Sequence, residues 1–141
     1  MSFFVVEPEV AGELGPGTEY DRSAQPAVVT KLEYRFSDWL GDAIVESVPC
    51  FIATEDLARA ISESSLTGVS FADVTVTISP EAEMLMTDEL PKWRWMQFSG
   101  SPYESDFGLS GDLSLIVSER ALAVLRHAGI SNADYYEAGN S

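Results

Sequence analysis

Hydrophobic and polar positions alternate most regularly between residues 27 and 36. Leu32 and Phe36 fall on one face of this segment, and Lys31 lies on the other. A period of two predicts a strand with one buried face. Residues 93–98 (WRWMQF) are apolar at both alternating sets of positions. Such a segment is typical of a strand in the centre of a sheet.

The segments FIATEDLARAI and LIVSERALAVL follow the same pattern, in which an extended apolar run leads into a helix. Thr54 and Ser118 are the predicted N-caps, and each is followed by an acidic residue in the first helical turn. Gly68 and Gly129 are expected to end the two units in a left-handed conformation. Capping and apolar periodicity can explain the similarity by themselves. Whether the two units share an ancestor is left open.

Other parts of the chain are expected to be irregular. Residues 7–25 are rich in Gly, Pro and acidic side chains and predict a long surface loop. Residues 38–42 predict a turn or a short helix. Residues 99–112 contain many Gly, Ser and Pro residues and predict a second loop. The tail from residue 135 is expected to fray.

These patterns predict an α+β fold for residues 1–141 as a single domain. The expected architecture is one mixed or antiparallel sheet of about five or six strands with two main helices packed on it. The strand order is left open. The expected strands lie near FFVV, VVTKLEYRF, CFIA, VTVTI, WRWMQF and LSLIV.

Targeting features favour a cytoplasmic location. No basic residue precedes the short apolar run at residues 3–6, so no secretory signal is expected. No stretch approaches the roughly 20 apolar residues that a membrane helix needs. The single cysteine, Cys50, cannot form an internal disulfide, which suits a reducing compartment.

The charge balance is strongly acidic. Eight Lys and Arg residues against 23 Asp and Glu residues give a net charge of −15. A surface of this kind repels nucleic acid and anionic membranes, because phosphate contacts need cations. We therefore expect a basic protein partner, although acidic side chains also serve solubility alone.

Candidate catalytic residues are few. His127 is the only histidine, and it lies near the end of a predicted helix, where a cation interacts favourably with the helix dipole. Cys50 follows a proline in an apolar run and is interpreted as a small buried residue. The chain has no CxxC or HExxH motif, and its DFG and GELGPG segments lack the other parts of a kinase or a phosphate-binding loop. We expect no enzyme activity, no metal and no cofactor.

A family resemblance is carried by the segments FFVVEPEV, WLGD, PCFIATE and DFGLSGDLSLIVSERALAVLRHAGI. In this order they resemble the bacterial polymorphic-toxin immunity proteins, a class formerly described only as a domain of unknown function. The resemblance implies a cytosolic, non-enzymatic inhibitor that binds one cognate toxin domain and occludes its active site. The alternatives are a small acidic ligand-binding or stress-response domain and, less favoured, a small enzyme.

The expected partner-binding face combines carboxylates with predicted turns and one aromatic side chain. Trp39 is either an interface anchor or a core residue, whereas Trp93 and Trp95 are expected in the core. Residues 100–112 are the second choice for this face. The oligomeric state is left open. The expected contact residues are Glu7, Glu9, Glu13, Glu19, Asp21, Asp38, Trp39 and Asp42.

Overall fold

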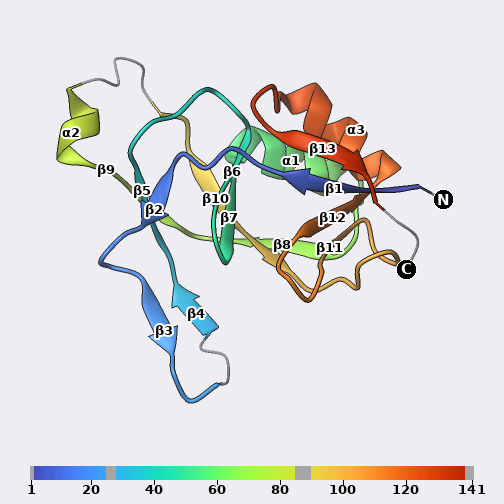
Figure 1. The fold of residues 1–141 in the computed structure, drawn as a ribbon, viewed down its shortest axis with the longest axis horizontal. Coiled ribbons are helices and arrows are strands. Elements are labelled where there is room, and N and C mark those ends of the chain that lie inside the picture. Colours follow the sequence, from blue (N-terminus) through green and yellow to red (C-terminus); the bar gives the residue numbers. More distant parts are fainter. Residues whose placement is uncertain (1, 25–27, 85–89, 139–141) are drawn as a thin grey trace.

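The computed structural model describes residues 2–24, 28–84 and 90–138 (Figure 1). Over these residues the chain forms thirteen strands in four sheets, with three helices. The prediction of a single sheet carrying two main helices was therefore wrong. Within the same ranges, no helix combines the length and the apolar character needed to cross a bilayer.

The helices are α1 (Glu55–Glu63), α2 (Pro80–Glu83) and α3 (Glu119–Ala128). The strands, in chain order, are β1 (Phe3–Glu7), β2 (Gly12–Leu14), β3 (Glu19–Asp21), β4 (Val28–Lys31), β5 (Glu33–Phe36), β6 (Ile44–Ser47), β7 (Cys50–Thr54), β8 (Val69–Ala72), β9 (Thr75–Ile78), β10 (Trp93–Phe98), β11 (Phe107–Leu109), β12 (Leu115–Ser118) and β13 (Asp134–Glu137).

The four sheets have the strand orders β11-β12-β1-β13, β6-β7-β10-β8, β2-β5-β9 and β3-β4. All pairs are antiparallel except β5 and β9, which run parallel. Strands β3 and β4 form a hairpin that projects from the body of the molecule, and we call it the arm (Figure 1).

The sheet β6-β7-β10-β8 separates two hydrophobic cores. Successive side chains of its central strands alternate between them, because neighbouring residues of a strand point to opposite faces. Phe51 and Met96 are register partners that point into the first core, while Ile52 and Trp95 are register partners that point into the second. The prediction that residues 93–98 form a central strand with Trp93 and Trp95 in the core is confirmed.

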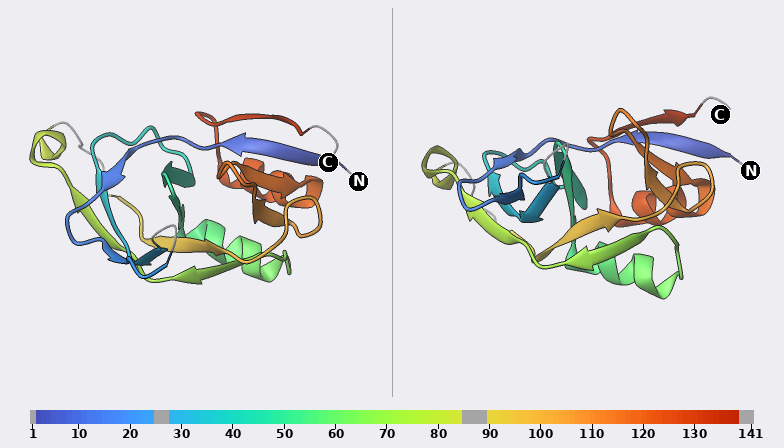
Figure 2. Two further views of the ribbon diagram at one scale, coloured as in Figure 1. Left: turned by 60° about the horizontal axis from the view of Figure 1, so that its bottom comes forward. Right: turned by 90° about the horizontal axis from the view of Figure 1, so that it is seen from below.

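The first core lies between this sheet and the sheet that contains β1. Strand β1 and the strands β8 and β10 lie on opposite sides of this half of the molecule (Figure 2). Helices α1 and α3 pack against each other and contribute Leu57, Ile61, Leu122 and Leu125, all buried. Burying side chains of this size contributes about 1.5–3 kcal/mol each to stability.

The second core is built around β5. Leu32, Tyr34 and Phe36 are fully or almost fully buried against Trp93 and Trp95. The rings form a contact series, with centroid distances of 4.7 Å between Tyr34 and Phe36 and 5.2 Å between Phe36 and Trp93. Tilted aromatic contacts of this kind add to the stabilisation from burial alone.

Residues 28–36 differ from the single strand that we expected over residues 27–36, and residue 27 lies outside the described residues. The strand is interrupted at Leu32, and its two halves join different sheets as β4 and β5. Only the second half has the expected buried face, because the first half projects into solvent with the arm.

Residues 7–25 also contain more structure than the predicted loop. Strands β2 and β3 lie in this segment, and Glu9 makes an isolated bridge to Val45. Gly12 allows the close approach of β2 to β5, since a side chain there would collide with the backbone of Arg35. A glycine that indicates a loop in the sequence thus serves strand pairing in the fold.

The remaining irregular segments need similar corrections. Of the two alternatives for residues 38–42, the short helix is wrong, and the segment is irregular with a bend at Gly41. The second predicted loop contains β11, and the tail expected to fray contains β13. Strand β13 is ordered by its register with β1, in which Phe4 lies opposite Glu137. These pairings join residues far apart in the sequence, so local composition does not indicate them.

Both predicted N-caps are confirmed. The hydroxyls of Thr54 and Ser118 each accept a hydrogen bond from the backbone N–H three residues on, at 3.2 and 3.1 Å. Gly129 is the C-cap of α3 with a φ of 107°. Gly68 also has a positive φ, of 91°, but α1 ends earlier, with Ser64 as its C-cap.

Gly129→Val should lower the free energy of unfolding by about 1 kcal/mol or more, because a branched side chain tolerates positive φ poorly. A Cβ at Gly129 would meet no neighbouring atom, so the cost comes from the backbone conformation alone. Gly111→Val is the matched control, because Gly111 also has open space around it and no positive φ is recorded there. Urea denaturation measures both variants, and equal stabilities would contradict the interpretation.

Candidate functional site

The two candidate catalytic residues lie in different parts of the fold. Cys50 is buried in the second core, and burial raises the pKa of its thiol to about 11. His127 is exposed in the last turn of α3. In the part of the chain that the structure describes, no three His, Cys, Asp or Glu residues form a group that could hold a metal ion.

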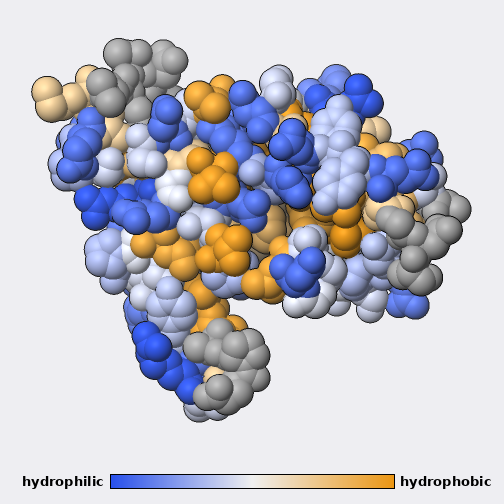
Figure 3. All heavy atoms as spheres, viewed as in Figure 1, coloured by the Kyte–Doolittle hydropathy of each residue, from blue (hydrophilic) through white to orange (hydrophobic). Residues whose placement is uncertain are grey.

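An acidic hollow of about 580 Å³ lies on the face shown in Figure 3, between β1, β6 and the turn that follows α3. No Lys, Arg or His is among the described residues that line this acidic hollow. Five carboxylates line it, from the N-terminal segment, β6, the turn before β12 and the start of β13: Glu7, Glu9, Glu46, Asp112 and Asp134.

Exposed apolar side chains border the same hollow. Val10, Leu40 and Val48 are 66%, 62% and 62% exposed, and Leu113 is 41% exposed. Figure 3 shows hydrophobic side chains gathered across the centre of this face. Contiguous exposed apolar surface rimmed by polar groups is characteristic of interaction sites.

A second hollow adjoins the first. It has a volume of about 590 Å³ and lies between the arm and the β6–β7 turn. We call it the apolar hollow, because its lining side chains are apolar except for Gln97 and the Cys50 thiol. Val48 and Leu113 line both hollows, which makes the two one continuous surface.

Sheet pairing places like charges together at the acidic hollow. Glu7 at the end of β1 is the register partner of Asp134 at the start of β13. Like charges directly opposite each other in a sheet are destabilising. The Tyr136 hydroxyl donates a hydrogen bond of 3.4 Å to Glu7, which offsets part of this repulsion. Burial, and secondly the charge of Glu7, raise the pKa of Glu46.

Asp112 is held by the turn that precedes β12. Its carboxylate accepts hydrogen bonds from the Ser110 hydroxyl and from the backbone N–H of Ser114, the latter at 3.2 Å. These bonds lower the pKa of Asp112, so it carries its charge over a wide pH range. The turn thus presents a fixed negative charge at the rim.

Two buried carboxylates support the wall of the acidic hollow. Glu9 is only 6% exposed and accepts hydrogen bonds from the backbone N–H groups of Leu40, at 2.6 Å, and Asp42, at 3.3 Å. Burial raises the pKa of Glu9, and its backbone hydrogen bonds oppose that rise. Glu9 therefore fixes residues 38–42 against the N-terminal segment.

Asp42 connects the same segment to the C-terminal part of the chain. It is 2% exposed, and its carboxylate accepts hydrogen bonds from the backbone N–H and the side-chain amide of Asn132, at 2.9 to 3.1 Å. Asn132 lies in the turn between α3 and β13. The side chains of Glu9 and Asp42 thus join three segments that are distant in the sequence.

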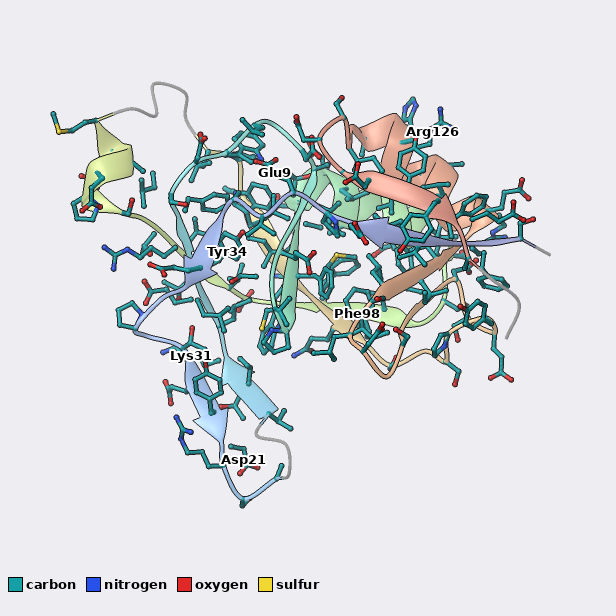
Figure 4. The ribbon with its side chains drawn as sticks, viewed as in Figure 1. Glu9, Asp21, Lys31, Tyr34, Phe98 and Arg126 are labelled. Atoms are coloured by element: carbon teal, nitrogen blue, oxygen red, sulfur yellow. The ribbon has the colours of Figure 1, made fainter. Side chains whose placement is uncertain are left out.

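The residues expected at the partner-binding face do not form one patch. Glu7 and Glu9 lie at the acidic hollow, while Glu19 and Asp21 lie on the arm. Figure 4 shows Asp21 at the far end of the arm, well away from Glu9 in the body of the molecule. Glu13 is exposed on β2, between these two locations.

The second expected segment is also divided. Asp38 is exposed, but Asp42 is buried. Trp39 is half-buried, with its ring 5.6 Å from that of Trp93, and its indole N–H donates to the backbone oxygen of Asp42 at 2.9 Å. The neighbouring Leu40 lines the acidic hollow instead.

Sequence reasoning missed Glu46, Asp112 and Asp134 as rim residues. Asp112 ends the loop that was the second choice for the face, so a local signal existed for it. Asp134 lies in β13 and Glu46 in β6, and their positions at the rim depend on strand pairings that no local pattern indicates.

Asp42→Ala should lower the free energy of unfolding by about 2 kcal/mol, since it removes a buried carboxylate that accepts hydrogen bonds from the backbone N–H and the side-chain amide of Asn132. Asp38→Ala is the matched control, because Asp38 lies in the same segment and is exposed. Chemical denaturation of both variants tests this. A loss of equal size in the two would show that the buried contacts of Asp42 are unimportant.

The thermal midpoint should be higher near about pH 5 than near about pH 7.5. Glu9 and Glu46 have folded pKa values above their ordinary 4.5, so the folded state binds more protons than the unfolded state and gains stability as the pH falls from neutral. Below that window the trend reverses. Burial by itself raises the pKa of Asp106, but hydrogen bonds from Ser118 and Thr67 outweigh this effect and leave the pKa below its ordinary value. Since the folded state then binds fewer protons than the unfolded state, the protein loses stability as the pH falls through the acid range.

Scanning calorimetry across this pH range measures the midpoint. Glu46→Gln removes one of the two carboxyl groups with a raised pKa. The thermal midpoint of this variant should therefore increase less between neutral pH and about pH 5. A midpoint that falls steadily from neutral pH downward would contradict the prediction.

Comparisons with known proteins assign no family: no protein-family model matches the chain, and no curated protein matches it significantly.

Proposed function

We propose that this protein is a cytosolic immunity protein, which binds a basic toxin domain and neutralises it by covering the toxin's active site. One observation carries the proposal. Nine large apolar side chains are exposed among the residues that the structure describes, and five of them line the two adjoining hollows, whose rim is acidic. These five are Val10, Val28, Leu40, Val48 and Leu113.

The combination of apolar and acidic groups supports a protein partner with basic side chains. Apolar contacts at the centre of an interface supply affinity, while charge complementarity raises the association rate and excludes wrong partners. The repulsion between Glu7 and Asp134 would be relieved by a cation placed between them. A Lys or Arg side chain of the partner therefore has a more favourable electrostatic interaction here than it would have beside a single carboxylate.

The overall charge supports the same kind of partner. At −15, the chain attracts a basic protein over a distance of about one Debye length, roughly 8 Å at physiological salt. Rapid capture suits an inhibitor that must act before its toxin does. The family resemblance noted above implies the same role.

A catalytic mechanism forms no part of the proposal. The Cys50 thiol is buried and has a pKa of about 11, so it is protonated at neutral pH. His127 lines a different hollow from Cys50. Binding alone accounts for the action that we propose.

A groove between α1 and α3 favours a second candidate function, the binding of a small ligand. The groove has a volume of about 570 Å³ and is lined by Trp39, Leu57 and Val124 among other residues. Its volume and apolar lining fall in the range of ligand-binding sites. A ligand-binding domain would lose activity when this groove is filled, for example by Ala123→Trp, and would not depend on the acidic hollow.

Glu7→Lys should reduce the protection of cells against a toxin domain encoded beside this gene. The substitution places a cation in the acidic hollow, and we expect the affinity for the toxin to fall by about 1.4 kcal/mol, or tenfold, mainly through slower association. The fold should tolerate the change, because Lys opposite Asp134 replaces a repulsive pair with an attractive one.

Glu63→Lys is the matched control, because this substitution changes the net charge by the same amount. Glu63 is an exposed acidic residue at the end of α1 and does not line the acidic hollow. Growth assays with co-expressed toxin, and association rates at low and physiological salt, provide the measurements. The proposal fails if no neighbouring gene product is toxic, or if the two variants protect equally well.

A further inference from the structure

The apolar hollow is formed by three segments that are distant in the sequence. Val28 comes from the arm, Val48 from the β6–β7 turn and Leu113 from the turn before β12. They are 53%, 62% and 41% exposed. Their convergence leaves apolar surface facing solvent, which is unfavourable and would be relieved by burial against a partner.

The arm itself is not held in place by a core of its own. All of its strand residues are exposed except the half-buried Val29. A two-stranded hairpin without a packed face is at best marginally stable in water. The arm is a wall of the apolar hollow rather than an extension of the core.

The base of the arm, in contrast, is firmly attached. Glu33 accepts hydrogen bonds at 2.7 Å from the backbone N–H of Gly17 and from the hydroxyl of Thr77. The backbone N–H of Glu33 donates to the hydroxyl of Thr18 at 3.1 Å. These bonds fix the base of the arm to the segment before β3 and to β9. Figure 4 shows the arm projecting from this base, with Lys31 near the body of the molecule and Asp21 at the far end.

The position of the apolar hollow beside the acidic hollow, together with the net charge of the chain, indicates which molecule occupies it. Val48 and Leu113 belong to both hollows, so a partner bound at the acidic hollow extends directly over the apolar one. A second copy of this chain would bring another net charge of −15 to an acidic surface, which opposes self-association. A basic partner is favoured at the same place.

We infer that the apolar hollow receives an extended apolar segment of the basic partner, flanked by Lys or Arg residues that reach the acidic hollow. The inference rests on the proposed function and adds the mode of recognition to it. Strand β4 pairs only with β3 among the described strands, so its other edge is available to an added strand. Apolar side chains of that segment would contact Val28 and Leu113.

The test uses a short synthetic peptide with a Val/Ile centre and two lysines at each end. Titration at low salt, followed by NMR of the full chain, should give saturable shifts at Gln97 and Val28, which line the apolar hollow. A peptide with the same centre and glutamate ends, and one with lysine ends and a Gly/Ser centre, should each bind about tenfold more weakly or worse.

The double variant Val28→Thr and Leu113→Asn should weaken the lysine-flanked peptide by about tenfold or more without unfolding the protein. Thr keeps the shape of Val, and Asn tolerates the positive φ of 67° at Leu113. Met84→Gln is the matched control, because Met84 is 87% exposed and lines neither hollow.

Two results would overturn the inference. One is that the double variant and the control bind the lysine-flanked peptide equally well. If the double variant also protects cells as well as the unaltered chain does, the proposed function stands without this mode of recognition. The other is a concentration-dependent dimer in sedimentation velocity that the double variant abolishes, since a second copy would then occupy the hollow. If Glu7→Lys loses toxin binding but the double variant does not, the proposed function stands and the inference about the apolar hollow fails.

Discussion

The fold depends on one sheet that must be apolar on both faces. Strands β7 and β10 separate the two cores, and their register partners Phe51–Met96 and Ile52–Trp95 are removed from water on opposite faces of the sheet. Phe51 and Ile52 are adjacent in the chain but belong to different cores. A polar residue at either position would face an interior with no water, where an unpaired polar group is costly. The two hydrophobic cores lie on opposite faces of this sheet.

The acidic side chains fall into two groups with different physical roles. Glu9 and Asp42 are buried and are stabilised by backbone and amide donors, so they act as internal cross-links between segments. Glu7 and Asp134 face each other across a strand pair and repel. Carboxylates thus hold segments together where they are buried and place like charges side by side where they are exposed, and only the exposed pair is accessible to a partner.

Local features of the fold could be predicted from the sequence, and non-local ones could not. The N-caps at Thr54 and Ser118 and the central position of residues 93–98 depend on neighbouring residues and were predicted correctly. The break at Leu32, which sends the two halves of one apparent strand into different sheets, depends on which distant strand each half meets. The acidic hollow has the same origin, because Glu46 and Asp134 reach it through pairings that a single sequence does not reveal.

Strand β1 leaves the ribosome before every other described strand, whereas both of its neighbours in the sheet, β12 and β13, follow all the other described strands. Phe3 pairs with Ser118, about 115 residues later, which corresponds to several seconds or more of synthesis at typical rates. During that time the nascent chain carries an apolar strand with both edges unpaired, the condition under which strands join the wrong chain. The net charge of −15 opposes such association, because nascent chains that carry many carboxylates repel one another until β12 and β13 have emerged.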